Sequence, residues 1–444
     1  MSLLHPSRRS FLTTLGSAGI VAPAFIRNLI SAPPSGRVRH ASFGAGGMAG
    51  ADIGAIVSHP SVDMVAAADV DAKRSEGFRK SPHGANARFY QDWRELLEKE
   101  SKNIDSISIG TPDHMHGPQA MAAMQLGIHC YLQKPLAQNI YEVRKLTEYA
   151  RERKLITQMG IQVHSDAAYR ACPVVVRSGV VGKIKEVHTW SSKKWGDSAP
   201  KPTNSDPVPD GLAWDLWLGV AAERPYVNGA YHPGNWRKRL DFGTGTFGDM
   251  GCHIYDPVFH ALELTSPISV KSVGPAPNEW SWAINAEIEY VFPGTKHTAD
   301  KTVKVTWYDG DKRPPQDVIA LLGDKKLPDQ GSIFIGTNGA IVQPHVGMAF
   351  VVPSDKFKDF TFEKPAGGNH RHEFIDAILG KGTTSAGFDY SGPLTEAVLL
   401  GGVATFHPNT LLEWDAAALK VKNNEDASRR IKRTYRKGWE VKGL

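Results

Sequence analysis

The stretch RVRHASFGAGGMAG at residues 37–50 is the feature that most constrains how this chain can fold. It is typical of a strand followed by a tight turn and then by a helix. Gly44 allows the turn, Gly46 lets a bound group come close to the backbone, and the small Ala49 lets the helix pack closely on the strand. The first turn of such a helix also presents free N–H groups and a partial positive charge. The pattern therefore predicts a phosphate-binding turn at the start of a strand–helix–strand unit.

The segments that follow continue this alternation over residues 36–160. Further strands are predicted at 62–69, 104–110, 127–133 and 155–161, and helices near 71–79, 114–126 and 139–153. Strands that alternate with helices pair in parallel through right-handed crossovers. The sequence therefore predicts an α/β protein that begins with a doubly wound parallel sheet, the Rossmann fold.

A carboxylate, Asp69, ends the second predicted strand, 25 residues after Gly44. At this position of a Rossmann fold the side chain can accept hydrogen bonds from the ribose hydroxyls of a dinucleotide. Asp69 and Asp71 would repel a 2′-phosphate, so NAD is favoured as the cofactor. Lys73 and Arg74 leave NADP open as an alternative.

The N-terminal segment indicates export and is set apart from the fold. SRRSFL at residues 7–12 places paired arginines before a mildly apolar stretch, and APA at 22–24 offers small residues for cleavage. This arrangement resembles a twin-arginine signal, which is read by a route that carries folded proteins. The alternative is an amphipathic helix with chance arginines. We expect residues 1–35 to be a signal peptide and linker, the twin-arginine export machinery to be a partner, and the protein to be periplasmic.

The net charge of +6 suggests nucleic-acid binding until it is located along the chain. Residues 420–444 hold nine basic and three acidic residues, so the rest of the chain is electrically balanced. We therefore expect a basic tail over 416–444, solvated or packed on a partner subunit, and no nucleic-acid partner. No apolar run is long enough for a membrane-spanning helix. The three cysteines fit neither a disulfide framework nor a zinc pattern, and no metal site is predicted.

Three further motifs carry a family resemblance. TPDHMH at 111–116 follows the third major strand, QKPLA at 133–137 follows the fourth, and GDMGCHIYD lies at 248–256. With them, residues 37–415 resemble the glucose–fructose oxidoreductase / inositol dehydrogenase / MocA (Gfo/Idh/MocA) family. The resemblance implies nicotinamide-dependent chemistry on sugars and cyclitols in a homo-oligomer. It also implies a C-terminal α/β domain with a large, mostly antiparallel sheet, which we expect to be a substrate and oligomerisation domain over 161–415.

The resemblance assigns the catalytic roles to Lys134, His253 and Asp249. Lys134 matches the lysine of the family's Glu-Lys-Pro motif, where an ammonium beside the reacting hydroxyl favours the developing alkoxide. Here Gln133 stands in place of the Glu, so a charge is missing next to the lysine, and the Lys134–Pro135 bond is a candidate for the cis form. Asp249 and His253 share a helix face and match the family's Asp-x-x-x-His. In that pair the histidine exchanges the hydroxyl proton and the aspartate holds a neighbouring hydroxyl.

Histidine and aspartate pairs in these motifs also allow other interpretations. One alternative is that His253 has a purely structural role. Another is a metal site built from Asp249, His253, Asp256 and His260, although alcohol oxidation already explains the pair Asp249 and His253. The TPDHMH loop is interpreted as lying against the cofactor, with its polar groups capping the next helix. The residues predicted to bind the cofactor are therefore Gly44, Gly46, Gly47, Met48, Asp69, Thr111, Pro112, His116 and Lys134.

The segment 229–245, GAYHPGNWRKRLDFGTG, mixes aromatic, basic and loop-forming residues just before the predicted catalytic helix. Because loops on a rigid scaffold carry specificity, we interpret it as part of a sugar pocket. Tryptophans are frequent between 190 and 282, where core packing is the better interpretation for any single one. The residues predicted to bind substrate are Tyr231, Trp236, Arg237, Asp249 and Asp256.

These observations predict an oxidoreductase that moves hydride between NAD and a secondary hydroxyl of a sugar, glycoside or cyclitol. Export constrains the mechanism, because a released cofactor would be lost to dilution outside the cell. We therefore expect tightly bound NAD in a closed redox cycle. One alternative is an NAD-using glycoside hydrolase that works by transient oxidation, elimination and hydration. A second alternative is a sugar-binding relative without catalytic activity.

Overall fold

Alternating apolar segments at the start of the chain build a six-stranded parallel sheet with the order β3-β2-β1-β4-β5-β6. The computed structural model describes residues 36–444, and the predicted twin-arginine signal lies outside this range. The central strands β4 and β5 are buried on both faces, as expected for a parallel sheet covered by helices. The strands are β1 (Val38–Phe43), β2 (Val62–Ala68), β3 (Arg88–Tyr90), β4 (Ser106–Ile109), β5 (His129–Leu132) and β6 (Thr157–Met159). The helices are α3 (Gly47–Val57), α4 (Glu76–Arg79), α5 (Trp93–Glu100), α6 (Asp113–Gln125) and α7 (Ile140–Glu152).

The Rossmann prediction is confirmed, with three local differences. Strand β3 and helix α5 were not predicted, and the helix expected at 71–79 forms only over Glu76–Arg79. The carboxylate of Asp71 accepts the backbone N–H groups of Lys73 and Arg74, which holds the chain in a turn where a helix would otherwise begin.

The second half of the chain forms a nine-stranded sheet in the order β13-β12-β11-β7-β10-β9-β8-β14-β15. Strand β7 pairs in parallel with β10, and the other pairs are antiparallel. The large, mostly antiparallel sheet is thereby confirmed. Its strands are β7 (Ile184–Ser191), β8 (Ser269–Ser272), β9 (Glu287–Pro293), β10 (Thr302–Asp309), β11 (Gly331–Gly336), β12 (Ala340–Pro344), β13 (Phe350–Val352), β14 (Leu412–Asp415) and β15 (Lys420–Val421).

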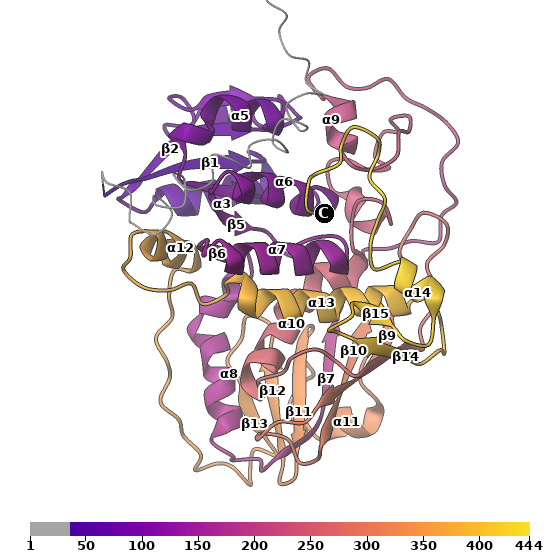
Figure 1. Ribbon diagram of the computed structural model, residues 1–444. Helices are drawn as coiled ribbons and strands as arrows, with labels where there is room; N and C mark the ends of the chain where they lie inside the picture. The colour runs from indigo at the N-terminus through magenta and orange to yellow at the C-terminus, as the bar shows by residue number, and fades with distance from the viewer. Residues whose placement is uncertain (1–35) are drawn as a thin grey trace, which may run out of the picture.

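Helices α10 and α13 lie between the two sheets. Figure 1 shows them below α7 of the Rossmann domain and above the strands of the large sheet. Phe247 on α10 packs against Trp307 of β10, while Val398 on α13 joins the same hydrophobic core. The helices of this half are α8 (Ala167–Arg177), α9 (Trp214–Leu218), α10 (Gly245–Leu262), α11 (Gln316–Ala320), α12 (His370–Ile378), α13 (Phe388–Ala404) and α14 (Glu425–Arg429).

The basic C-terminal segment packs on its own chain, so the prediction of a solvated tail over 416–444 is wrong. Trp439 is buried with the Arg94 guanidinium 4.2 Å above its ring, and Tyr435 donates its hydroxyl hydrogen to Glu142 Oε1 at 2.5 Å. Arg436 Nη1 lies 2.6 Å from Asp215 Oδ1. Apolar residues between the charges, which include Ile431, give the segment a face to bury.

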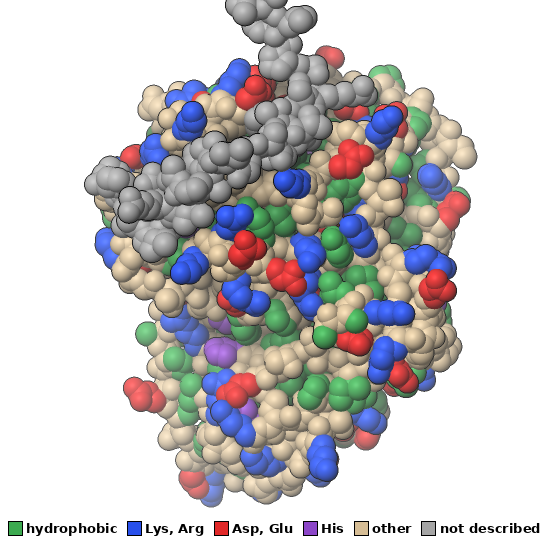
Figure 2. Space-filling view, viewed as in Figure 1, with side chains coloured by type: hydrophobic (Ala, Val, Ile, Leu, Met, Phe, Trp, Pro, Cys, Tyr) green, Lys and Arg blue, Asp and Glu red, His purple; other side chains and the backbone are tan. Residues whose placement is uncertain are grey.

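The surface carries both signs of charge. Figure 2 shows Lys and Arg interspersed with Asp and Glu over the face in view. Within residues 36–444, no helix is both long and apolar enough to cross a bilayer.

Candidate active site

A pocket of about 200 Å³ opens at the carboxyl ends of β1, β2 and β4, where a doubly wound fold binds its ligand. A methyl group on Gly44 would lie 2.9 Å from the Ala49 Cβ, and one on Gly46 would lie 3.0 Å from the Arg74 carbonyl oxygen. Gly44 also has a φ of +87°. The turn therefore requires glycine at position 44 and leaves little room for a side chain at position 46, and its backbone forms a cradle for a pyrophosphate at the start of α3.

Asp69 stands at the rim of this pocket, as predicted for a residue that binds ribose. Its Oδ2 accepts the Ala45 N–H at 2.8 Å and its Oδ1 accepts the Asp71 N–H at 2.9 Å. These bonds fix the carboxylate while leaving lone pairs on both oxygens for ribose hydroxyls. The residues present therefore fit NAD. Of the predicted cofactor residues, those that line the pocket are Gly44, Gly46, Gly47, Met48, Asp69, Thr111 and Pro112.

His116 has a different place from the one predicted. Helix α6 begins at Asp113, so His116 lies in its first turn and is almost fully buried. Its Nδ1 lies 2.7 Å from the Pro135 carbonyl oxygen, and its Nε2 lies 2.8 Å from the Thr111 carbonyl oxygen. The ring therefore joins the loops that follow β4 and β5, and it supports the pocket from behind.

Residues 209–238, which we call the cover segment, close the other side of the pocket. The Ala72 N–H donates to the Gly211 carbonyl at 2.9 Å, and His232 Nε2 lies 2.8 Å from Asp71 Oδ2. The segment's residues in the pocket wall are Trp217, His232, Pro233, Trp236 and Arg237. Trp217, His232 and Pro233 were not predicted to bind the cofactor, although His232 and Pro233 belong to the segment 229–245 that was interpreted as part of a sugar pocket.

Two predicted substrate residues, Trp236 and Arg237, thus lie in the cofactor pocket. A third, Tyr231, is 2% exposed and packs edge-on against Phe242 in an aromatic cluster beneath the segment. Its role in the described structure is to hold the cover segment in place.

Lys134 and Asp249 form an ion pair beside the pocket. The Lys134 Nζ donates to Asp249 Oδ1 at 2.6 Å and to the Asp249 carbonyl oxygen at 3.0 Å. The Lys134–Pro135 bond is cis, as the sequence suggested. Trp195 Nε1 donates to Asp249 Oδ2 at 2.8 Å, and Arg237 Nε lies 3.4 Å from Oδ1. Burial alone would raise the pKa of the Asp249 carboxyl, but the Lys134 and Arg237 cations outweigh it and hold the pKa well below its usual range.

His253 lies one helical turn after Asp249 on α10, as the four-residue spacing predicted. Its ring is 9% exposed, and its Nδ1 is buried without a hydrogen-bond partner among the described residues. Burial, helped by the positive charge of Lys134, holds the pKa of His253 well below the ordinary value. The imidazole is therefore neutral in the described structure.

Gln133 points away from Lys134. Its side-chain amide is buried and donates to Asp52 Oδ2 on α3 at 2.6 Å. The other Asp52 oxygen accepts from Arg371 Nη2 of α12 at 2.6 Å. The glutamine therefore belongs to the contact between α3, β5 and α12, and its neutral amide suits the carboxylate that it meets.

Asp256 was predicted to bind substrate, but it lies in the interior with 1% exposure. It accepts from His164 Nδ1 at 2.8 Å and from the Tyr390 hydroxyl at 2.6 Å. Asp249 and Asp256 thus serve different partners, and the four residues considered for a metal site are not gathered around one point. Over residues 36–444, no group of three or more His, Cys, Asp or Glu side chains is placed to hold a metal ion.

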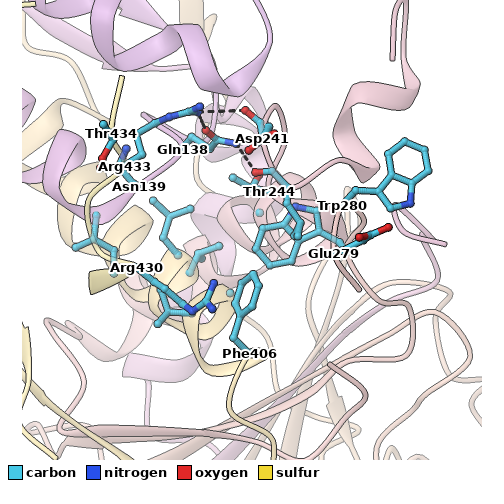
Figure 3. Close-up of a pocket in the computed structure, with 18 residues that line it drawn as sticks. Gln138, Asn139, Asp241, Thr244, Glu279, Trp280, Phe406, Arg430, Arg433 and Thr434 are labelled. Carbon is cyan, nitrogen blue, oxygen red and sulfur yellow. Dashed lines mark hydrogen bonds between the residues drawn. The ribbon is translucent and has the colours of Figure 1, made fainter. Parts of the chain in front are cut away.

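A second cavity, of about 420 Å³, lies beside the first turn of α10 and the end of α13 (Figure 3). The C-terminal segment forms one wall, where Arg433 Nη1 donates to Gln138 Oε1 and to the Asp241 carbonyl oxygen. Arg430 of the same segment also lines the cavity, and its guanidinium stands 4.0 Å above the Phe406 ring. This cavity is separate from the Lys134–Asp249 pair.

Comparisons with known proteins agree with this architecture. Residues 38–161 match the family model described as an oxidoreductase family with an NAD-binding Rossmann fold, and residues 171–441 match the C-terminal α/β domain of the same family. A levoglucosan dehydrogenase from Pseudarthrobacter phenanthrenivorans is 21% identical over 186 residues, which is 42% of this chain and 37% of the relative. An inositol 2-dehydrogenase from Rubrobacter xylanophilus is 30% identical over 125 residues, 28% of this chain and 34% of the relative. The chain thus matches little more than a third of the length of these curated relatives.

Solved structures share the whole fold at low identity. The WlbA dehydrogenase from Bordetella pertussis, solved in complex with NADH and UDP-GlcNAcA, has a TM-score of 0.59 at 14% identity. The match covers 85% of this chain and 99% of that one. With both domains matched to its family models and the glycine cradle and Lys134–Asp249 pair in place, the chain belongs to the Gfo/Idh/MocA family of NAD-binding oxidoreductases.

Proposed function

We propose that the protein is an oxidoreductase that moves hydride between NAD and a secondary hydroxyl of a sugar, glycoside or cyclitol. The observation that carries the proposal is the position of Arg237, which lines the cofactor pocket and also contacts Asp249 of the Lys134 pair. The lysine therefore stands next to the place where a dinucleotide would end. The names of the relatives, a levoglucosan dehydrogenase and inositol dehydrogenases, support this substrate class.

The chain's own residues divide the work on the hydroxyl. Two hydrogens of the Lys134 ammonium bind Asp249, and the third is available to the substrate oxygen. A fixed cation at this point stabilises the alkoxide that develops during oxidation. Neutral His253 takes the hydroxyl proton. NAD, when bound, supplies the acceptor for the hydride.

We propose further that NAD stays bound through a closed redox cycle in an exported protein. The resemblance of residues 1–35 to a twin-arginine signal supports export of the folded chain. The cover segment supports retention of the cofactor, because it lines one side of the pocket and is tied to the Rossmann domain by the Ala72–Gly211 hydrogen bond and the His232–Asp71 contact.

The first experiment is to purify the protein with its own leader from the exported fraction, denature it, and identify the nucleotide released. We expect close to one NAD(H) per chain. His232→Ala, which removes the contact with Asp71, should retain less. Empty wild-type protein that binds added NAD only weakly would contradict the closed cycle.

A second experiment separates the two kinds of cycle. The purified protein is incubated with paired sugars and, separately, with an aryl glycoside without any added acceptor. Oxidation of one sugar coupled to reduction of the other supports the oxidoreductase. Release of the aryl alcohol supports the glycoside hydrolase. Unchanged behaviour of Lys134→Ala in both assays would support an inactive sugar-binding relative.

A further inference from the structure

The protein itself engages most of the Asp249 carboxylate. Lys134 and Arg237 contact Oδ1 and Trp195 donates to Oδ2, which leaves one lone pair on Oδ2 for a substrate hydroxyl. Asp249 therefore positions the lysine and can only accept from the neighbouring hydroxyl. The oxygen of that hydroxyl can also accept a hydrogen bond, and the donor must come from another side chain.

His345 is the side chain placed to provide it. It follows β12, and its ring centroid lies 5.7 Å from that of His253, with 44° between the two planes. The ring is half-buried, and among the described residues its hydrogen bond is to Tyr169 of α8. Burial, with the charges of Lys134 and Lys193, lowers the pKa of His345 to about 4, so the ring is neutral.

The Tyr169 hydroxyl determines which nitrogen of His345 carries the hydrogen. Tyr169 is 3% exposed, and its oxygen lies 2.6 Å from His345 Nδ1. Burial holds the pKa of Tyr169 well above its usual value, so the hydroxyl keeps its hydrogen. The Tyr169 oxygen already accepts a backbone hydrogen bond from Val346, so we assign its hydroxyl as the donor to Nδ1, which leaves the hydrogen of the neutral ring on Nε2. In this tautomer His345 presents an N–H donor for which residues 36–444 supply no acceptor.

The turn that carries His345 is strained. The next residue, Val346, has a φ of +61° and is 59% exposed. A β-branched residue rarely adopts this conformation, and such strain gathers at functional sites.

We propose that His345 binds, through Nε2–H, the oxygen on the carbon next to the one oxidised, and so selects substrates with two adjacent ring hydroxyls. The inference rests on the proposed function, since it names a specificity residue for the same site. His253 and Lys134 act on the reacting hydroxyl, while His345 holds its neighbour and sets the orientation of the ring.

The test combines enzyme variants with substrate analogues. Glucose, methyl β-glucoside and myo-inositol are offered to the protein, and reduction of the bound nicotinamide is followed. The best substrate is then compared with its mono-deoxy derivatives on wild type, His345→Ala and His345→Gln. His83→Ala, at an exposed histidine, is the matched control.

We expect His345→Ala to lower kcat/KM on the parent sugar about 10- to 100-fold. On the derivative without the adjacent hydroxyl, the kcat/KM values of wild type and His345→Ala should agree within about twofold. This derivative lacks the hydroxyl that His345 would bind, so removing the histidine costs no further bond. His345→Gln keeps an N–H donor and should recover part of the loss. Tyr169→Phe should give a several-fold loss on the parent sugar only, since it frees the tautomer of His345.

An equal loss on every derivative, or no loss on any, would overturn the assignment. If none of the three sugars reduces the bound nicotinamide of the wild-type protein, the proposed function fails. The affinities of wild type and His345→Ala for the same three sugars are then compared by calorimetry. In that case, affinity of His345→Ala equal to that of wild type for all three overturns the role of His345 as well.

Discussion

Replacing Gln133 by Glu should destabilise the protein by about 3–5 kcal/mol at neutral pH. The amide is 5% exposed and donates to Asp52 Oδ2 at 2.6 Å, while Asp52 itself is 1% exposed. The substitution turns a donor into an acceptor that faces a carboxylate. Two such charges about 4 Å apart repel by roughly 4 kcal/mol at an effective dielectric constant of about 20. The lost hydrogen bond to a charged group adds about 1.5–3 kcal/mol, and relaxation of the two side chains offsets part of the sum.

The loss should depend on pH in a definite direction. Each carboxylate raises the folded-state pKa of the other above its unfolded value, so the pair takes up a proton. A carboxyl whose pKa is higher in the folded than in the unfolded state lowers the free energy of unfolding as pH rises from the unfolded to the folded pKa. The gap between Gln133→Glu and wild type should therefore be smallest in acid and widen toward neutral pH.

Denaturant and thermal unfolding across this pH range measure the gap. Gln316→Glu, at an exposed glutamine in the first turn of α11, is the matched control and should leave stability within about 0.5 kcal/mol. The double variant Asp52→Asn with Gln133→Glu restores a donor opposite the new carboxylate and should recover much of the loss. The reasoning would be refuted if Gln133→Glu were as stable as wild type, or if the difference in unfolding free energy between the two proteins did not change with pH.

Three further predictions concern the site, the C-terminal segment and a buried acid. Lys134→Met should lower the rate of hydride transfer, measured by single-turnover absorbance, about 10²- to 10⁴-fold, while the bound nucleotide is retained. An unchanged rate would show that Lys134 takes no part in the reaction. Tyr435→Phe leaves buried Glu142 without its hydroxyl donor and should cost about 1–3 kcal/mol in denaturant unfolding, whereas an unshifted midpoint would mean that the segment is not docked. Burial raises the pKa of Asp309 to about 7, so its carboxyl lowers stability as pH rises from about 4 to 7, by about 4 kcal/mol in all. Asp309→Asn should flatten that decline in thermal unfolding, and parallel pH profiles for the two proteins would contradict it.

The parts of the fold that were predictable are those in which local pattern and tertiary structure agree. The strand and glycine turn at residues 37–50 define their own geometry, because only glycine fits at Gly44. The three-residue β3 is too short for a periodicity, and the turn made by Asp71 overrides the helical pattern after it.

Within the site, the sequence indicates residue types and spacing but does not show which way the side chains point. Helical spacing brought Asp249 and His253 to one face of α10, as predicted. Gln133 lies next to Lys134 in the chain, yet it turns toward Asp52 on α3. His345 comes from a turn of the large sheet, and no motif joins it to His253; their proximity exists only after the second domain has packed.

The C-terminal segment also couples two regions that lie far apart in the sequence. Tyr435 and Trp439 lie against α7 and α5 of the Rossmann domain, about 300 residues earlier in the chain. The Rossmann domain therefore gains part of its packing from the other end of the described chain. Its stability should rise and fall with the docking of that segment, so the two regions unfold as one cooperative unit.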